Sequence, residues 1–269
     1  MINSTATRSD SQYSLAKILG IWALAAVPMG ILGWVVYPAL TPNREADPLG
    51  AAITRTILLA AGLAWQFVLA MFIVYREEGD LRWTTIRRRF WLNAPLDPKT
   101  GEPRRRLWLW LIPLVALFFA DMQGYGPVLS NLWQQVLPFL APPPGFNPFD
   151  LLFASPELQA QLVGAWGFYG LLLVLAVFNI LGEEFLFRGV LLPKMEGVFG
   201  KWDWVANGVL FAVYHLHEPW FLLNHVVGGI VLFALPARRF RSTWLAIIVH
   251  SMQFVIMLPM ILMVVLGLV

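Results

Sequence analysis

Long apolar runs dominate this chain and restrict its possible folds more than any other feature. Seven such runs occur, and several hold the roughly 20 apolar residues that a helix needs to cross a bilayer. Charged residues make up 13% of the chain, about half the share in an ordinary soluble domain. This composition excludes an ordinary soluble enzyme and a disordered chain, and the lack of cysteine excludes a disulfide scaffold or a thiol nucleophile. The runs cover residues 15–37, 52–75, 107–122, 163–180, 202–215, 220–235 and 244–269.

These runs predict an all-α fold, a polytopic transmembrane helix bundle of about seven or eight spans. The fifth run is short for a full span, and Pro259 is expected to kink the last one. No internal repeat is visible, which argues against an inverted-repeat transporter. The predicted parts are an N-terminal transmembrane region at 1–123, an external Pro- and Asn-rich loop at 124–160, a C-terminal membrane domain at 163–256 and the end of the last helix at 257–269.

The basic residues are concentrated in one loop. Residues 76–106 hold nine Lys and Arg against five acids, whereas the rest of the chain has a net charge of −1. Because basic loops stay in the cytoplasm, this loop and the N-terminus are expected inside and residues 124–160 outside. We interpret the loop as a topology signal, with docking on anionic lipid headgroups as the alternative. The small net charge of +3 does not indicate nucleic-acid binding.

Two acidic residues interrupt the fourth apolar run. Glu183 and Glu184 stand in a stretch that stays apolar to about residue 192, and ionisable groups inside membrane segments are costly and usually functional. Arg188 follows Glu184 by four residues, so the two share a helix face and are expected to pair. Glu183 is left for another partner. The alternative is that both acids only mark the cytoplasmic end of this span.

Two histidines stand in other apolar runs. His215 ends the fifth run, four residues after Phe211, and His250 is the only ionisable side chain between Thr243 and the C-terminus. The structural interpretation is a hydrogen bond to the backbone for His215 and one between helices for His250. The functional interpretation is that both imidazoles approach the glutamates.

The remaining polar residues of this region have a weaker functional signal. His225 follows Asn224 in the sixth run and fits either a supporting role in a site or simple helix packing. His217 and Glu218 stand beside a proline and fit a loop.

Together, the acids and the two imidazoles are suited to amide hydrolysis without a covalent intermediate. A carboxylate and an imidazole can take a proton from water, and a second imidazole can donate to the oxyanion that forms. The sequence has no G-x-S-x-G or H-E-x-x-H motif, so a serine hydrolase or a common zinc protease lacks support. We expect Glu183, His215 and His250 to converge around a water-sized cavity open to the cytoplasmic side or to the bilayer.

These residues resemble the motifs of the CPBP family, the CAAX-protease and bacteriocin-processing (Abi) intramembrane proteases. An E-E-x-x-x-R motif runs from Glu183 to Arg188, an F-x-x-x-H motif runs from Phe211 to His215, and His250 matches a histidine in a later helix. The resemblance covers residues 163–256, which it identifies as a CPBP-like intramembrane protease domain.

The resemblance implies a role for each motif residue. Glu183 would activate water with His215, Glu184 and Arg188 would support its position, and His250 would stabilise the oxyanion. The implied protein is a multi-pass intramembrane endopeptidase of a prokaryotic cell membrane. Its partners would be the bilayer and a membrane-embedded or lipidated protein substrate, such as a prenylated CAAX protein.

The chain departs from the family at one position. The family pattern H-x-x-x-N ends in an asparagine that supplies a second oxyanion donor, but Phe254 stands there, and Gln253 is one residue short. Loss of one such donor costs about 10²–10³ in rate. Gln253 is therefore a candidate second donor, with Asn224 and His225 as possible supporting residues. The alternative function is a weak or inactive member acting as a membrane scaffold or immunity-type protein; a solute transporter is disfavoured by the apolar third and sixth runs.

Metal dependence is left open by the residues. Glu183, His215 and His250 could hold zinc as two imidazoles and one carboxylate with an open position for water. No two histidines share a helix at a spacing of four residues, which favours a glutamate-based mechanism without an obligatory metal.

Overall fold

The computed structural model describes residues 11–147 and 156–268. These residues form helices and no β-strand, apart from an isolated bridge between Leu96 and Pro103. The all-α prediction is confirmed. The first ten residues, residues 148–155 of the external loop predicted at 124–160, and the last residue of the chain lie outside the described part.

Six helices in the described part are long and apolar enough to cross a membrane, fewer than the seven or eight spans predicted. The chain is an integral membrane protein, and large apolar side chains exposed on its spans fit this: Ile112 is 67% exposed and Val35 is 62% exposed. The six spans are Leu15–Leu40, Pro48–Glu78, Arg105–Val136, Trp166–Lys194, Pro219–Phe240 and Thr243–Val265.

The first two spans are bounded by local capping interactions. The Ser14 hydroxyl accepts a hydrogen bond from the backbone N–H of Lys17, and Asp47 accepts one from Gly50. Gly79 ends the second span at a φ of 82°, a left-handed conformation that glycine adopts readily. In the labels below, η marks 3-10 and π helices. The first span comprises α1 (Leu15–Ile31), the π-helical η2 (Leu32–Val36) and α2 (Tyr37–Leu40), and the second is α3 (Pro48–Glu78).

The basic loop that follows is ordered by its own hydrogen bonds. It holds the short helix α4 (Trp83–Arg89) and then a turn in which Asp97 accepts the backbone N–H of Lys99. This bond and the Arg104 guanidinium, which lies 2.9 Å from Asp97, hold the pKa of Asp97 below its usual value. The loop is thus a folded cap on one end of the bundle.

The third span is longer than the sequence predicted. We expected a run that ends near Asp121, but the helix continues to Val136, so the prediction of a loop over 124–136 is wrong. The polar Asp121 begins a π-helical turn rather than ending the helix, and the residue is buried, with 9% of its surface exposed. The span comprises η3 (Arg105–Trp110), α5 (Leu111–Ala120), the π-helical η4 (Asp121–Tyr125) and α6 (Gly126–Val136). Two short helices follow, η5 (Pro138–Leu140) and α8 (Pro156–Leu162).

The fourth span runs through both glutamates, which is one of the two alternatives that the sequence left open. The fifth apolar run is not a span, because its helix, α11 (Asp203–Tyr214), has only 12 residues and ends at His215. The fourth span comprises α9 (Trp166–Glu183), the π-helical η6 (Glu184–Leu191) and η7 (Leu192–Lys194), and α10 (Glu196–Phe199) and η8 (Gly200–Trp202) precede α11.

The last two spans complete the bundle. Pro259 lies inside the final helix without ending it. The fifth span comprises η9 (Pro219–Phe221), α12 (Leu222–Gly228), the π-helical η10 (Gly229–Ala234) and α13 (Leu235–Phe240), and the sixth is α14 (Thr243–Val265).

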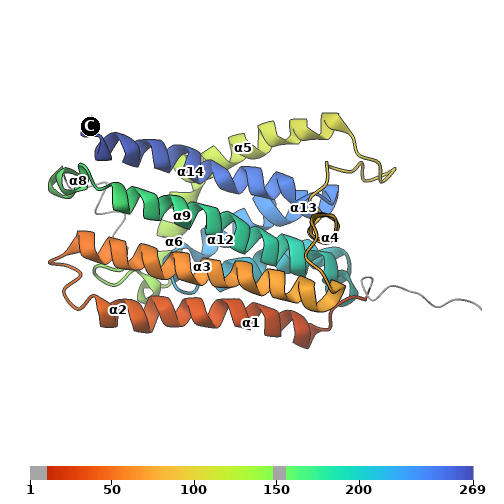
Figure 1. Cartoon of the computed structure of the whole chain (residues 1–269), viewed down its shortest axis with the longest axis horizontal. Coiled ribbons are helices and arrows are strands. Elements are labelled where there is room, and N and C mark those ends of the chain that lie inside the picture. The colour runs from red at the N-terminus through yellow and green to blue at the C-terminus, as the bar shows by residue number, and fades with distance from the viewer. Residues whose placement is uncertain (1–10, 148–155, 269) are drawn as a thin grey trace, which may run out of the picture.

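The long helices lie roughly side by side, with α4 at one end of the molecule and α2 and α8 at the other (Figure 1). The most extensive contact is between α3 and α9. Gly182 permits it, because a Cβ at this position would lie 2.4 Å from the backbone oxygen of Leu63. This close approach fixes the part of α9 that carries the two glutamates.

Candidate active site

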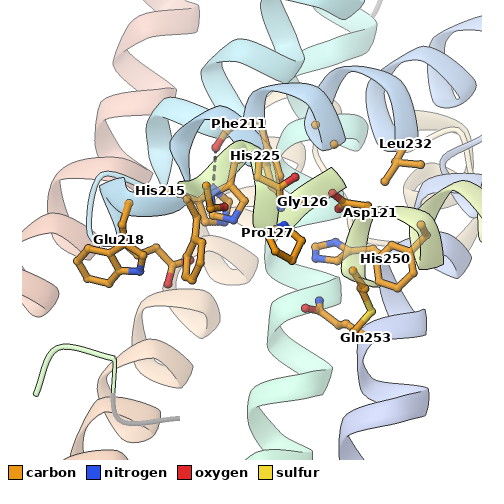
Figure 2. A pocket seen from close by; sticks show the side chains of 18 of the residues that line it. Asp121, Gly126, Pro127, Phe211, His215, Glu218, His225, Leu232, His250 and Gln253 are labelled. Atoms are coloured by element: carbon orange, nitrogen blue, oxygen red, sulfur yellow. Dashed lines mark hydrogen bonds between the residues drawn. The ribbon is translucent and has the colours of Figure 1, made fainter. Parts of the chain in front are cut away.

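A cavity of about 890 Å³ lies between the third to sixth spans and α11. Figure 2 shows His215, His225 and Glu218 along one part of its lining and His250 and Gln253 along another. Separate helices therefore deliver the residues that the sequence singled out.

Glu183 lies between two imidazoles. Its Oε1 is 3.7 Å from Nε2 of His215, and its Oε2 is 3.6 Å from Nε2 of His250. The carboxylate is 2% exposed, and Oε2 has no hydrogen-bond partner. The Tyr214 hydroxyl donates to Oε1 at 3.3 Å. Glu183, His215 and His250 thus converge as expected, at distances that leave their facing atoms free of a direct hydrogen bond.

Glu184 is in direct contact with His250. Nδ1 of His250 donates to Oε1 of Glu184 at 2.8 Å, and the Arg188 guanidinium lies 3.4 Å from the same oxygen. The predicted pairing of Glu184 with Arg188 is therefore present, but the contact of Glu184 orients His250 rather than Glu183. All three side chains are buried, and Arg188 also stacks on the ring of Phe211 at 4.1 Å.

The π-helical segments contribute to this arrangement. Glu184 and Arg188 both stand in η6, and Arg188 donates at 3.4 Å to the carbonyl of Gly229, the first residue of η10. A π-turn disrupts the regular hydrogen-bond ladder of an α-helix and often occurs at functional sites. The carbonyl of Gly229, in the fifth span, thus helps to hold the Arg188 guanidinium beside Glu184.

His215 has a defined orientation. Its Nδ1 lies 2.8 Å from the carbonyl oxygen of Phe211, and since a carbonyl only accepts, Nδ1 carries the proton. Nε2 therefore presents its lone pair towards Glu183. The backbone hydrogen bond expected from the structural interpretation and the approach to the glutamate are both present.

Gln253 lines the cavity, whereas Phe254 is not among the described lining residues. The Gln253 amide donates to Asn179 at 2.9 Å, which leaves its second N–H available. Asn224 and His225, the possible supporting residues, also line the cavity.

Sequence reasoning missed four residues around the site. Tyr214 contacts Glu183, Gln66 of α3 donates to the Tyr214 hydroxyl at 2.7 Å, and Asp121 and Glu218 line the cavity. A signal existed for Gln66 and Asp121, because each is a polar residue in an apolar run. The sequence predicts a loop at Glu218, and only the fold shows that this loop lines the cavity.

The cavity extends away from the basic loop. Its described lining reaches Pro142 and Asn147, which follow the third span, and includes no residue of 76–106. The sequence predicts an opening towards the cytoplasmic side or the bilayer. The wall of the cavity continues towards the end of the bundle opposite the basic loop, and the side of the membrane that this end faces stays a prediction.

One group of possible metal donors occurs among the described residues. Ligand atoms of His215, Glu218 and His225 all lie within 4.8 Å of one another. The set considered from the sequence, Glu183, His215 and His250, does not meet this spacing in the described part of the chain.

Comparison with known proteins identifies one family. Residues 165–256 match the family model of the type II CAAX prenyl endopeptidase Rce1-like proteins. The resemblance to the CPBP and CAAX-protease family is therefore confirmed for this segment, which contains Glu183, His215 and His250. Neither a curated protein nor a solved structure shows significant similarity to the chain.

Proposed function

We propose that this protein is an intramembrane endopeptidase that hydrolyses a peptide bond of a membrane-embedded or lipidated substrate with an activated water. The observation that carries the proposal is the buried Glu183 carboxylate between Nε2 of His215 and Nε2 of His250, at 3.7 and 3.6 Å. Polar atoms at such distances suit a bridging water. The match to an endopeptidase family over the same residues supports the assignment.

In the proposed mechanism Glu183 and His215 accept the proton of the attacking water. The water oxygen bonds to the carbonyl carbon, and the proton moves to the Glu183 carboxylate or to Nε2 of His215. Collapse of the tetrahedral intermediate breaks the C–N bond, and the same proton passes to the leaving amine. Tyr214 positions the Glu183 oxygen on the His215 side, because its hydroxyl donates to Oε1.

His250 and Gln253 are the proposed oxyanion donors. His250 acts in its imidazolium form, in which both ring nitrogens carry a proton: Nδ1–H donates to Glu184, and Nε2–H is donated towards the developing charge. The free N–H of Gln253 replaces the asparagine donor expected from the family, whose position Phe254 occupies. His250 and Gln253 both line the cavity.

The proposed topology places the N-terminus and residues 76–106 in the cytoplasm. The nine basic residues of this loop support it through the preference of basic loops for the cytoplasm. Under this topology the cavity extends towards the outer face. The substrate peptide would then reach Glu183 from that face or from the bilayer.

The test is to compare newly formed protein N-termini in membranes of cells that produce the wild type or Glu183→Gln. The substitution keeps the size of the side chain but removes the carboxylate that accepts the proton of the water. We therefore expect it to abolish the cleavage products. Glu45→Gln, in the exposed turn before α3, is the matched control and should retain them. Products unchanged in Glu183→Gln would contradict the assignment.

The second candidate is a scaffold or immunity-type protein without catalysis. Phe254 in place of the family asparagine favours it. Under this alternative the biological role survives in Glu183→Gln, and a substrate-trapping purification with this variant recovers stable partners rather than uncleaved substrate.

A further inference from the structure

We propose that His215, Glu218 and His225 form a binding site for a divalent transition-metal ion, best suited to Zn²⁺. One ligand atom from each residue lies within 4.8 Å of the other two. The residues come from the end of α11, the turn after it and α12, and Figure 2 shows them together at one part of the cavity lining. This site is different from the Glu183, His215 and His250 set.

The two imidazoles have nitrogens available for a metal. Nδ1 of His215 is occupied by the Phe211 carbonyl, so Nε2 is its metal-binding atom. Nδ1 of His225 is buried and has no hydrogen-bond partner. The ring centroids of the two histidines are 4.2 Å apart. Zinc holds its ligands at about 2.0–2.1 Å, which brings tetrahedral donors to roughly 3.3 Å from one another, so each pair of these donor atoms, now within 4.8 Å, has to approach by at most about 1.5 Å.

The charges around the site favour a cation. The described lining of the cavity contains Asp121, Glu183 and Glu218 and no Lys or Arg. One cation, Arg55 of α3, acts electrostatically on Glu218 but is not part of this lining. A divalent ion among the three donors would therefore face two further carboxylates across the cavity.

The donor set selects the class of metal. Two imidazoles and one carboxylate are typical of zinc, whereas Mg²⁺ and Ca²⁺ prefer oxygen ligands alone. Three protein ligands leave one coordination position open. Metal at Nε2 of His215 uses the lone pair that faces Glu183, so the metal-bound form and the proton-accepting form of this imidazole exclude each other. Metal binding itself does not depend on the proposed peptidase activity.

The test is a direct measurement of zinc binding to the full-length protein in detergent. The protein is stripped with a chelator and titrated with Zn²⁺ in competition with a fluorescent zinc indicator. We expect one high-affinity site in the wild type. His225→Gln and Glu218→Gln should each weaken it by at least about 10-fold, since loss of even an outer partner of a metal ligand costs 10–100-fold.

Two variants serve as matched controls. His217→Gln changes an imidazole that stacks near His215, with ring centroids 5.6 Å apart, but that is not one of the three donors. His250→Gln removes a donor of the alternative set. Both should keep the wild-type affinity, and thermal unfolding should confirm that every variant is folded.

The outcomes separate this proposal from the peptidase assignment. Absence of a high-affinity site in the wild type, or unchanged affinity in His225→Gln and Glu218→Gln, overturns the metal site and leaves the peptidase proposal intact. Weakened binding in His250→Gln instead overturns the donor set in favour of the alternative one. Conversely, unchanged cleavage in Glu183→Gln contradicts the peptidase and has no bearing on zinc affinity.

Discussion

Arg188 is the cation of the buried charge cluster beside the cavity. Its guanidinium has none of its surface exposed and lies beside Glu184, which in turn holds His250. Arg188→Met would leave the Glu184 carboxylate buried without its cation, and breaking such a pair costs about 3–5 kcal/mol. We expect this loss in chemical unfolding of the detergent-solubilised protein. The double variant Arg188→Met, Glu184→Leu should recover part of it, whereas wild-type stability in the single variant would show that the pair is not needed.

Gln253 allows the proposed oxyanion donors to be tested separately from the fold. Its amide is partly exposed at the cavity and bonds only to Asn179 among the described residues. Gln253→Ala should lower the cleavage rate by about 10²–10³, the usual cost of one oxyanion donor, with little change in the unfolding temperature. Gln253→Glu, which keeps the size but loses the N–H, should be as slow. Cleavage at the wild-type rate in both variants would assign the role to His250 alone.

At the scale of the elements, the close contact between α3 and α9 requires a glycine at position 182. A Cβ at Gly182 would meet a backbone oxygen of α3, which cannot move aside as a side chain can. Gly182→Ala should therefore separate the helices, at a cost of about 1–3 kcal/mol, and displace Glu183. Gly170→Ala on the same helix is the control, because a Cβ there meets nothing within 4 Å. Equal unfolding temperatures and activities for the two variants would contradict the prediction that Gly182 is needed for the close approach of α3 and α9.

The elements also show where sequence reasoning succeeded and failed. The pair of acids in the fourth apolar run left two alternatives open, an end of the span at the acids or a helix that continues past them, and the helix continues to Lys194. At Asp121 the prediction was wrong: the sequence predicts the end of the third span there, but the helix continues. A buried polar residue in a π-turn has the same sequence pattern as a helix end. The contact of Gln66 with Tyr214 could not be predicted, because nothing in the periodicity of α3 specifies which helix packs against it.

At the scale of the whole molecule, the orientation of the bundle decides which side of the membrane the cavity faces. The chain has no cysteine, so single cysteines can be introduced without a background. Glu45→Cys and Thr100→Cys lie in exposed segments at opposite ends of the bundle. We expect a membrane-impermeant maleimide to label Glu45→Cys in intact cells and Thr100→Cys only after permeabilisation. The reverse pattern would show that the cavity extends towards the cytoplasm.

The π-helical segments also have a consequence for how relatives of this chain can be compared. A π-helical turn holds one more residue than an α-helical turn, because its hydrogen bonds join residues five apart instead of four. A relative that lacks one residue in η10 could therefore continue from α12 to α13 as an ordinary α-helix and keep Arg238 beside Asp203, its ion-pair partner. The change would fall on η10 itself, whose first residue, Gly229, accepts from Arg188. A one-residue gap at η10 in a relative thus predicts a change beside Arg188 and not at the far end of the span.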